Sequence, residues 1–319
     1  MRLMKSTMLA AAATLWVMCS PTLAQEQPQA DTPPGGVNVV NESLERARLG
    51  PFLPDPPSEQ GVCPPSGYAP PKYVLAGDND GILNAFEVAS PCNTQELRDA
   101  AEAIGMGRYR PIVLKSLLTI RFTAKGYLAP GLGLGADTQV LTHMNFLTDS
   151  VRLEAKAPRA KPVVHVVDDG LAWDEATAGE GFSPAPKGAA AERSPLLKLT
   201  PFGALLSIIE AEGHATQRQV DGRWVMSGAS PYDKVQVTIA FNAQKEPETV
   251  EFKDHGHAYK AVFSGYSTKW EPGYWYVFPE RMVWTRDGKP LADLTVVEYK
   301  SNPYLVFPRP PFIKTPARF

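Results

Sequence analysis

Residues 234–299 carry the pattern that most limits how this chain can fold. The first run in this stretch is apolar at every second position: Val235, Val237, Ile239 and Phe241. Such alternation is typical of strands that bury one face and expose the other. Short polar turns, among them Asp287-Gly288, separate this run from those that follow. Because short turns join antiparallel neighbours, we expect an antiparallel sheet here.

The same alternation predicts more strands on the N-terminal side of this stretch. Two helices, 94–108 and 200–212, are indicated by a threonine in the N-cap position and by apolar residues at helical spacing. Residues 177–192 are rich in Ala, Gly, Pro and Ser, and we expect them to form a mobile insertion. The further strands expected are 117–126, 139–146, 150–156, 163–168, 170–174, 215–220 and 223–228.

These elements together predict a mainly β (α+β) fold. An antiparallel sheet with this many strands must curl, and the helix expected at 200–212 is placed to cover the concave face. We therefore expect residues 94–303 to form a large curved antiparallel sheet. Its shape would be a half-closed, open β-barrel around one embedded helix.

The first 24 residues have the features of a secretory signal peptide. Arg2 and Lys5 precede a short apolar run, and small residues precede Gln25. The run is too short to span a bilayer as a permanent helix. Bulky residues before Cys19 argue against a lipoprotein signal. We expect cleavage after Ala24 and a periplasmic or secreted protein.

Charge and hydropathy exclude two classes of function. The net charge of −2 becomes −4 once Arg2 and Lys5 are removed. A chain with this balance has no basic footprint for nucleic acid. No second long apolar segment follows the signal peptide, so we expect that the protein is not an integral membrane protein. No motif indicates a cofactor, and we expect none.

Proline is dense at both ends of the mature chain. Residues 25–93 form a proline-rich N-terminal arm, which offers a route for docking a protein partner. Residues 304–319 form a proline-rich C-terminal tail. The mature chain keeps Cys63 and Cys92, and an even number of cysteines in an exported chain suggests a disulfide. Free or metal-bound thiols are the alternative.

Two stretches resemble parts of metal sites. His255 and His257 lie two residues apart and could begin a site, although the sequence implies no third ligand. Asp78, Asp80 and Glu87 occupy three positions of a calcium-binding loop, but an alanine stands where its first ligand is needed. Ordinary polar turns explain both stretches, so no metal is expected.

Acidic residues and a histidine flank Trp173 and give the chain its candidates for acid–base catalysis. They are His165, Asp168, Asp169 and Glu175. Such acids also cap strand ends, which is the commoner role. No Gly-x-Ser-x-Gly or Cys-x-x-Cys motif is present, so neither a serine hydrolase nor a dithiol oxidoreductase is expected.

Aromatic residues crowd into the hairpin expected around residues 270–284. They include Trp270, Trp275 and Trp284, and rings are expected on both faces. Exposed aromatics mark a ligand groove or a partner surface. Alternatively, residues 304–307 of the tail cover the second face.

The order of elements resembles a family of exported bacterial proteins. The features that carry the resemblance are residues 100–105 before the 117–126 strand, Asp169–Trp173, and the series 278–281, 287–290 and 302–303. It resembles the periplasmic lipoprotein-carrier and lipid-binding group. It also resembles the accessory β-domain of exported metallo-β-lactamase-fold hydrolases. The resemblance implies an unclosed barrel with a helix in its mouth, and it brings no catalytic residues.

We therefore expect a non-enzymatic protein that binds an apolar ligand, such as an acyl chain or lipid, between the sheet and the 200–212 helix. One alternative is an exported enzyme that uses acids or histidines near Trp173 and His255. The other is a docking subunit of an envelope complex. The expected ligand-binding residues are Phe241, Phe252, Trp284, Leu205, Ile209, Trp270 and Trp275.

Overall fold

The computed structural model describes residues 73–76, 80–83, 93–106, 119–146, 148–211, 213–271, 274–301, 303 and 305–313. For 73–76, 80–83, 269–271, 274 and 275 the description covers the backbone alone. The predicted signal peptide and the cysteines predicted to form a disulfide, Cys63 and Cys92, lie outside this part of the chain. Both remain predictions.

Thirteen strands form one open antiparallel sheet, and β8 and β9 are its two edges. A separate hairpin consists of β1 (Tyr73–Ala76) and β2 (Asp80–Leu83). The strands of the large sheet in spatial order are β8 (Ser183–Pro184), β7 (Leu171–Glu175), β6 (Val163–Asp168), β5 (Ser150–Lys156), β4 (Gly135–Asn145), β3 (Thr119–Leu128), β15 (Lys289–Ser301), β14 (Tyr274–Arg286), β13 (His257–Glu271), β12 (Pro247–Asp254), β11 (Gln236–Phe241), β10 (Arg223–Ala229) and β9 (Thr216–Val220).

The helical elements are short, and most lie in one connection. α2 (Gln95–Ala103) precedes the sheet. α3 (Ala189–Arg193), the 3-10 helix η2 (Ser194–Leu196) and α4 (Pro201–Ile209) link β8 to β9. This connection therefore takes the chain from one edge of the sheet to the other. Within the described residues, every helix is too short or too polar to cross a bilayer.

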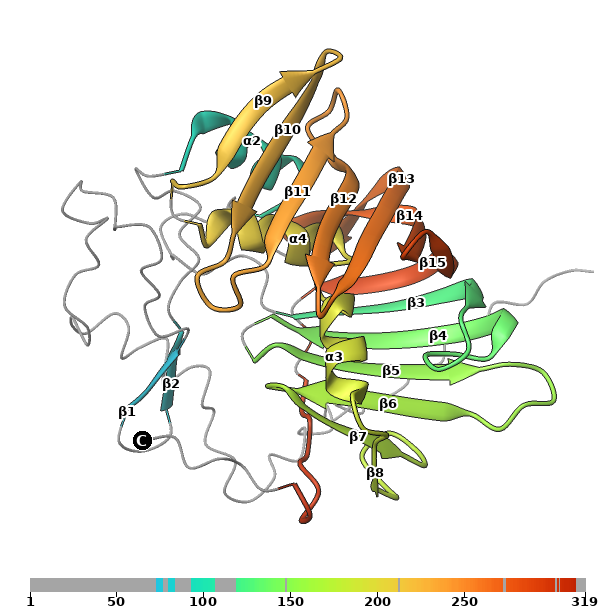
Figure 1. The fold of residues 1–319 in the computed structure, drawn as a ribbon. Coiled ribbons are helices and arrows are strands. Elements are labelled where there is room, and N and C mark those ends of the chain that lie inside the picture. Colours follow the sequence, from blue (N-terminus) through green and yellow to red (C-terminus); the bar gives the residue numbers. More distant parts are fainter. Residues whose placement is uncertain are drawn as a thin grey trace, which may run out of the picture.

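The sheet curls so that its two halves face each other across a common core. In Figure 1, β9–β12 run across the direction of β3–β6, and α4 lies behind β10–β12 on the inner side. Alternate residues of β3–β6 and β10–β15 contribute to this inner face. Representative core residues are Phe122, Met144, Leu153, Val237, Ile239, Val250, Ala261 and Leu294. The predicted curved, half-closed sheet with one embedded helix is confirmed.

Sequence explains where α4 begins and why it is wholly buried. The Thr200 hydroxyl accepts a hydrogen bond from the Gly203 amide, and Pro201 occupies the first turn. All nine residues of α4 are buried, and none is charged. A helix without a polar face must be surrounded by apolar side chains. Here the inner faces of β10, β11 and β12 supply contacts with it.

Gly203 marks the closest approach of α4 to the preceding segment. A Cβ at this position would stand 2.0 Å from the Leu197 carbonyl oxygen and 3.2 Å from the Phe146 ring. Gly203→Ala is therefore expected to destabilise the protein by about 2 kcal/mol, although alanine normally favours a helix. Urea unfolding measures the change. Ser207→Ala, on the same helix, is the control and should cost about 1 kcal/mol or less. A more stable Gly203→Ala variant would contradict the packing described.

The β13–β14 hairpin extends past its neighbours and bends over one end of the sheet. The pair keeps one register along its length, but the pairing is interrupted at Gly265, which has a φ of 66°. Beyond this bend the Val277 amide donates to the Ile104 carbonyl oxygen of the α2 C-terminus. An aromatic cluster fills the space beneath it: Phe122, Phe202, Tyr276, Phe278 and Tyr299. One end of the half-barrel is thus closed by aromatic side chains.

The structure bears on two irregular segments. Residues 177–192, expected to form a mobile insertion, contain the two-residue strand β8 and the start of α3, and their mobility stays a prediction. Residues 305–307 of the tail do not cover the aromatic hairpin. They lie against β5, where Arg152 donates to the Val306 carbonyl oxygen and its guanidinium stands over the Phe307 ring. Arg193 at the end of α3 attaches the first segment to β6 and β7, and Arg152 on β5 holds the second. Neither segment has a regular local sequence pattern.

Candidate functional site

Five of the seven residues expected to bind an apolar ligand lie together in the core. Leu205 and Ile209 project from α4, and Phe241, Phe252 and Trp284 project from the inner face of the sheet. Each of the five is at most 5% exposed. The structure therefore shows a closed, apolar region between α4 and the sheet.

Trp284 brings an unpaired polar atom into this region. Its indole Nε1 is buried and has no hydrogen-bond partner among the described residues. Nearby on the same face, the Tyr259 ring stacks on Phe252, with ring centroids 5.1 Å apart. Burial raises the pKa of the Tyr259 hydroxyl. A buried N–H without an acceptor is uncommon and calls for an explanation. A bound molecule that offers an oxygen is one.

Trp270 and Trp275 face each other as a backbone pair near the tip of the β13–β14 hairpin. The backbone alone is described at these two positions. Their predicted role in ligand binding therefore stays a prediction.

His165 belongs to a buried polar cluster beneath α3. Its Nδ1 lies 2.8 Å from Asp174 Oδ1 and 3.0 Å from Arg193 Nη2. Arg193 also donates to the carbonyl oxygens of Val166 and Trp173. Burial lowers the pKa of His165, because desolvation penalises the imidazolium. The cluster attaches α3 to β6 and β7.

Asp168 and Glu175 lie on the other face of the same strands. Ser150 donates to Asp168, and Arg309 of the tail pairs with it at 2.5 Å. Glu175 pairs with Arg152 at 3.1 Å and accepts from the Trp173 indole. The structure therefore does not unite the candidate acids with His165, because alternate residues of a strand point to opposite faces.

Asp169 occupies the turn between β6 and β7. Its φ is 51°, and its carboxylate lies 3.7 Å from Arg309 Nη2. This geometry is that of a tight two-residue hairpin, in which Asp is well tolerated. Asp169 thus adds charge to the contact with the tail.

The histidine pair lies at the β12–β13 turn. His255 has a φ of 48°, and His257 Nδ1 is 2.6 Å from Asp287 Oδ2. Among the residues that the structure describes, no three potential metal ligands come together. Asp80 is in β2, paired with Ala76. Asp78 and Glu87 lie outside the described residues.

Arg152 and Arg193 were missed by sequence reasoning, although they organise both polar clusters. Arg152 stands at an outward position of a strand whose inward neighbours are apolar, and Arg193 follows three alanines and Glu192. The sequence did carry a signal for both: an arginine inside a segment of apolar or small residues indicates a buried, paired side chain. Both side chains are buried and paired with carboxylates.

His143 lies on the same outer face as Arg152. Its pKa is lowered to about 4, first by burial and then by the charges of Arg152 and Arg121. Above that pH the ring is neutral, so it adds no charge to the outer face in neutral solution.

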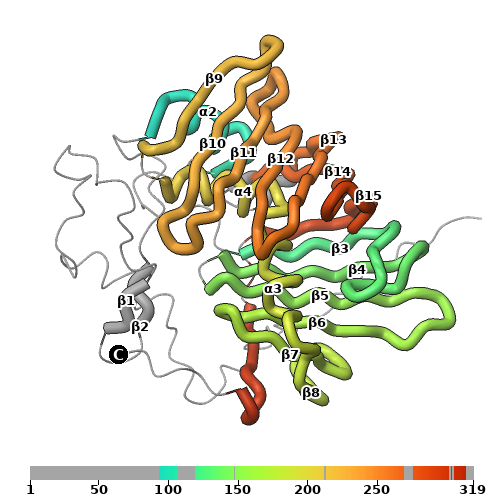
Figure 2. Tube along the Cα trace, in the orientation of Figure 1, coloured from blue at the N-terminus to red at the C-terminus, as the bar shows by residue number. Residues whose placement is uncertain are grey.

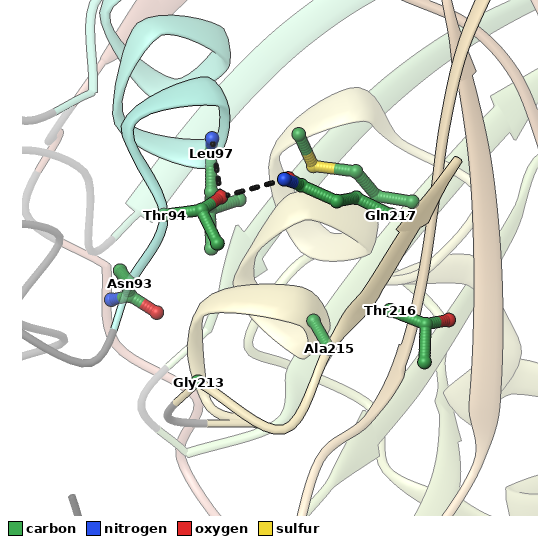
Figure 3. A pocket seen from close by; sticks show the side chains of 8 residues that line it. Asn93, Thr94, Leu97, Gly213, Ala215, Thr216 and Gln217 are labelled. Atoms are coloured by element: carbon green, nitrogen blue, oxygen red, sulfur yellow. Dashed lines mark hydrogen bonds between the residues drawn. The ribbon is translucent and has the colours of Figure 1, made fainter. Parts of the chain in front are cut away.

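Hollows also open at the surface of the described part of the chain. The smaller, about 10 Å³, lies between α2 and β9–β10, where Thr94 bonds the Leu97 amide and the Gln217 side chain (Figure 3). That volume suits one water at most. The larger, about 470 Å³, lies over β11–β14 and is lined mainly by polar residues such as Thr238, Glu251 and Lys260. Phe252 and Tyr259 also contribute to its lining, whereas Leu205 and Ile209 of α4 do not.

No protein-family model and no curated protein matches this sequence. Among solved structures, the chain is similar to a LolA superfamily protein, NE2245 from Nitrosomonas europaea. The identity is 11%, the TM-score is 0.38, and the alignment covers 66% of this chain and 94% of that chain. A likeness at this level carries no argument about function. The likeness to the accessory domain of metallo-β-lactamase-fold hydrolases stays a prediction.

Proposed function

We propose that the protein is a non-enzymatic carrier that binds an apolar molecule, such as an acyl chain, between α4 and the concave face of the sheet. One observation carries the proposal: the unpaired Trp284 N–H lies in a region whose other side chains, apart from Tyr259, are apolar. An acyl chain that ends in a carbonyl or carboxylate would match both features. Its hydrocarbon would contact the core, and its oxygen would accept from Trp284.

The way α4 is held supports this proposal. The helix contacts the sheet through apolar side chains, which are not directional and can exchange one apolar neighbour for another. The charged attachments cited here lie before its N-terminus instead. Lys198 pairs with Asp233, and Arg193 holds α3. A helix that is held by ion pairs before its N-terminus and contacts the sheet through apolar side chains is suited to move aside for a ligand.

The predicted catalytic residues favour binding over catalysis. Asp168 and Glu175 are engaged by Arg309 and Arg152 on the outer face, while His165 is engaged by Asp174 on the inner face. An acid and a base that act together must reach the same substrate atoms. We therefore propose carriage of the molecule, in the periplasm if the signal peptide directs the chain there.

Trp284→Phe tests the role of the indole. The variant keeps an aromatic ring but removes the donor, so affinity for a fluorescent long-chain fatty acid should fall by up to about tenfold. Affinity for a purely hydrocarbon probe should change little, because such a probe offers no acceptor. Titrations followed by fluorescence measure both constants.

Trp224→Phe is the matched control, because Trp224 packs at the margin of the same core. It should leave both affinities near the wild-type values. Equal losses for the fatty acid and the hydrocarbon in Trp284→Phe would refute the hydrogen bond. Absence of saturable binding of either probe to the wild-type protein would refute the carrier.

A further inference from the structure

The C-terminal tail lies across the outer face of the sheet without joining it. Residues 305–313 have no helix or strand, and Figure 2 shows this red segment beside β6 and β7. At its start, Thr119 on β3 donates to the Pro303 carbonyl oxygen at 2.8 Å. From there the tail passes over β5 and reaches β6. It is held by side chains rather than by a ladder of backbone hydrogen bonds.

Arg309 makes the charged contact of the tail. Its Nε lies 2.5 Å from Asp168 Oδ2, and its Nη2 lies 3.7 Å from Asp169 Oδ2. Asp168 is buried and accepts a second hydrogen bond from Ser150 Oγ. A buried carboxylate oriented by a neighbour recognises a guanidinium specifically, because Arg presents several donors in a fixed plane.

Arg152 makes the second contact, with the aromatic part of the tail. Its guanidinium carbon stands 5.2 Å from the centre of the Phe307 ring, and its Nη1 donates to the Val306 carbonyl oxygen at 3.3 Å. Glu175 holds Arg152 from the other side. Arg152 therefore contacts one aromatic ring and one backbone carbonyl oxygen of an extended chain.

An apolar strip completes the surface. Val164, Val166 and Trp173 are buried, and Phe307 and Ile313 of the tail pack against them. This cluster is separate from the core beneath α4. We call the surface formed by Arg152, Val164, Val166, Asp168 and Trp173 the outer strip.

We propose that the outer strip is a binding site for extended, proline-rich peptide segments of a partner protein that carry an aromatic residue and an arginine, and that residues 305–313 occupy it as an internal ligand. The recognised pattern is Phe307-Pro308-Arg309-Pro310-Pro311. Proline keeps such a segment extended before it binds and so lowers the entropy lost on binding. The internal copy competes at the high effective concentration of a tethered ligand.

The chain also contains a natural contrast to this pattern. In the N-terminal arm, residues 54–57 read Pro-Asp-Pro-Pro, whereas residues 308–311 read Pro-Arg-Pro-Pro. Both segments follow a phenylalanine closely, so they share proline and aromatic content and differ in charge. Asp168 and Asp169 would repel the aspartate of the arm. Recognition by the outer strip therefore selects the tail pattern over the arm pattern.

The test uses the full chain with the internal ligand weakened. In Arg309→Asp the tail loses its ion pair and meets repulsion from Asp168. A labelled peptide with the sequence of residues 303–313 should then bind, and fluorescence anisotropy should give a dissociation constant at least about tenfold lower than for the wild-type chain. Adding Asp168→Asn to Arg309→Asp should remove most of this binding.

Two control peptides define the specificity. A tail peptide with aspartate in place of arginine and a peptide of residues 51–57 should both fail to bind the Arg309→Asp chain. Circular dichroism of each variant establishes that the sheet is intact. Equal binding of all three peptides, or no binding of the tail peptide to a folded Arg309→Asp chain, would overturn the proposal. Apolar-ligand binding beneath α4 is measured separately, since the two sites lie on opposite faces.

Discussion

A disulfide between Ala211→Cys and Gly228→Cys is expected to abolish binding of a fluorescent fatty acid, with affinity falling by at least about a hundredfold while the bond is intact. The reason is that the proposed ligand enters between α4 and the sheet. A covalent link at the C-terminal end of α4 holds the helix on β10. A loss of that size corresponds to about 3 kcal/mol of binding free energy.

The local geometry allows this link. A Cβ on Gly228 would lie 3.2 Å from the Ala211 Cβ and 3.4 Å from Ile208 Cδ1. Natural disulfides join Cβ atoms about 3.5–4.5 Å apart, so a shift of a few tenths of an ångström suffices. The sheet itself is left unchanged, because Gly228 keeps its place in the β10–β11 ladder.

Reduction provides the internal control. Dithiothreitol should restore binding to the double-cysteine variant. The wild-type chain is treated in parallel, because the disulfide predicted between Cys63 and Cys92 would respond to the same reagent. Full affinity in the oxidised variant would mean that α4 does not move to admit the ligand, and the proposed location would be wrong.

Arg152→Met should destabilise the protein by about 3–4 kcal/mol. The Glu175 carboxylate would stay buried with its cation gone. Its remaining donors are the Trp173 indole and the Gly179 amide. The Phe307 ring and the Val306 carbonyl oxygen would lose their contact at the same time. Guanidinium chloride unfolding, followed by circular dichroism, measures the loss.

Arg281→Met is the control for this substitution. Arg281 pairs with Asp293 through two hydrogen bonds, but the pair is exposed on β14 and β15. Water screens such pairs, so the unfolding midpoint should change little. Similar losses of stability for both variants would show that the cost of Arg152→Met does not come from the burial of the Arg152–Glu175 pair.

Local sequence was sufficient to predict most elements, because their determinants lie within a few residues. The alternation in 150–156 and 163–168 gave the bounds of β5 and β6, and Asp221-Gly222 gave the turn between β9 and β10. Thr94 and Thr200 cap α2 and α4 as expected. The pairing of β15 with β3 depends instead on contacts between distant residues, which no local pattern encodes.

The candidate site was predicted only in part, because some of its features follow from local strand alternation and others depend on contacts between distant residues. The inner position of Phe241 and Phe252 follows from strand alternation, and so does the opposition of His165 to Asp168. Strand alternation alone could have placed His165 and Asp168 on opposite faces of the sheet. The contacts of Arg309 with Asp168 and of Arg193 with Asp174 join residues far apart in sequence. They depend on how the tail and the β8–β9 connection return to the sheet.

Native mass spectrometry of the protein, before and after solvent extraction and after incubation with a long-chain fatty acid, tests the carrier most directly. We expect one apolar molecule per chain, lost on extraction and regained on incubation. We expect the oxidised Ala211→Cys/Gly228→Cys variant to regain none. A wild-type chain that keeps its bare mass under all three conditions would contradict the proposed function.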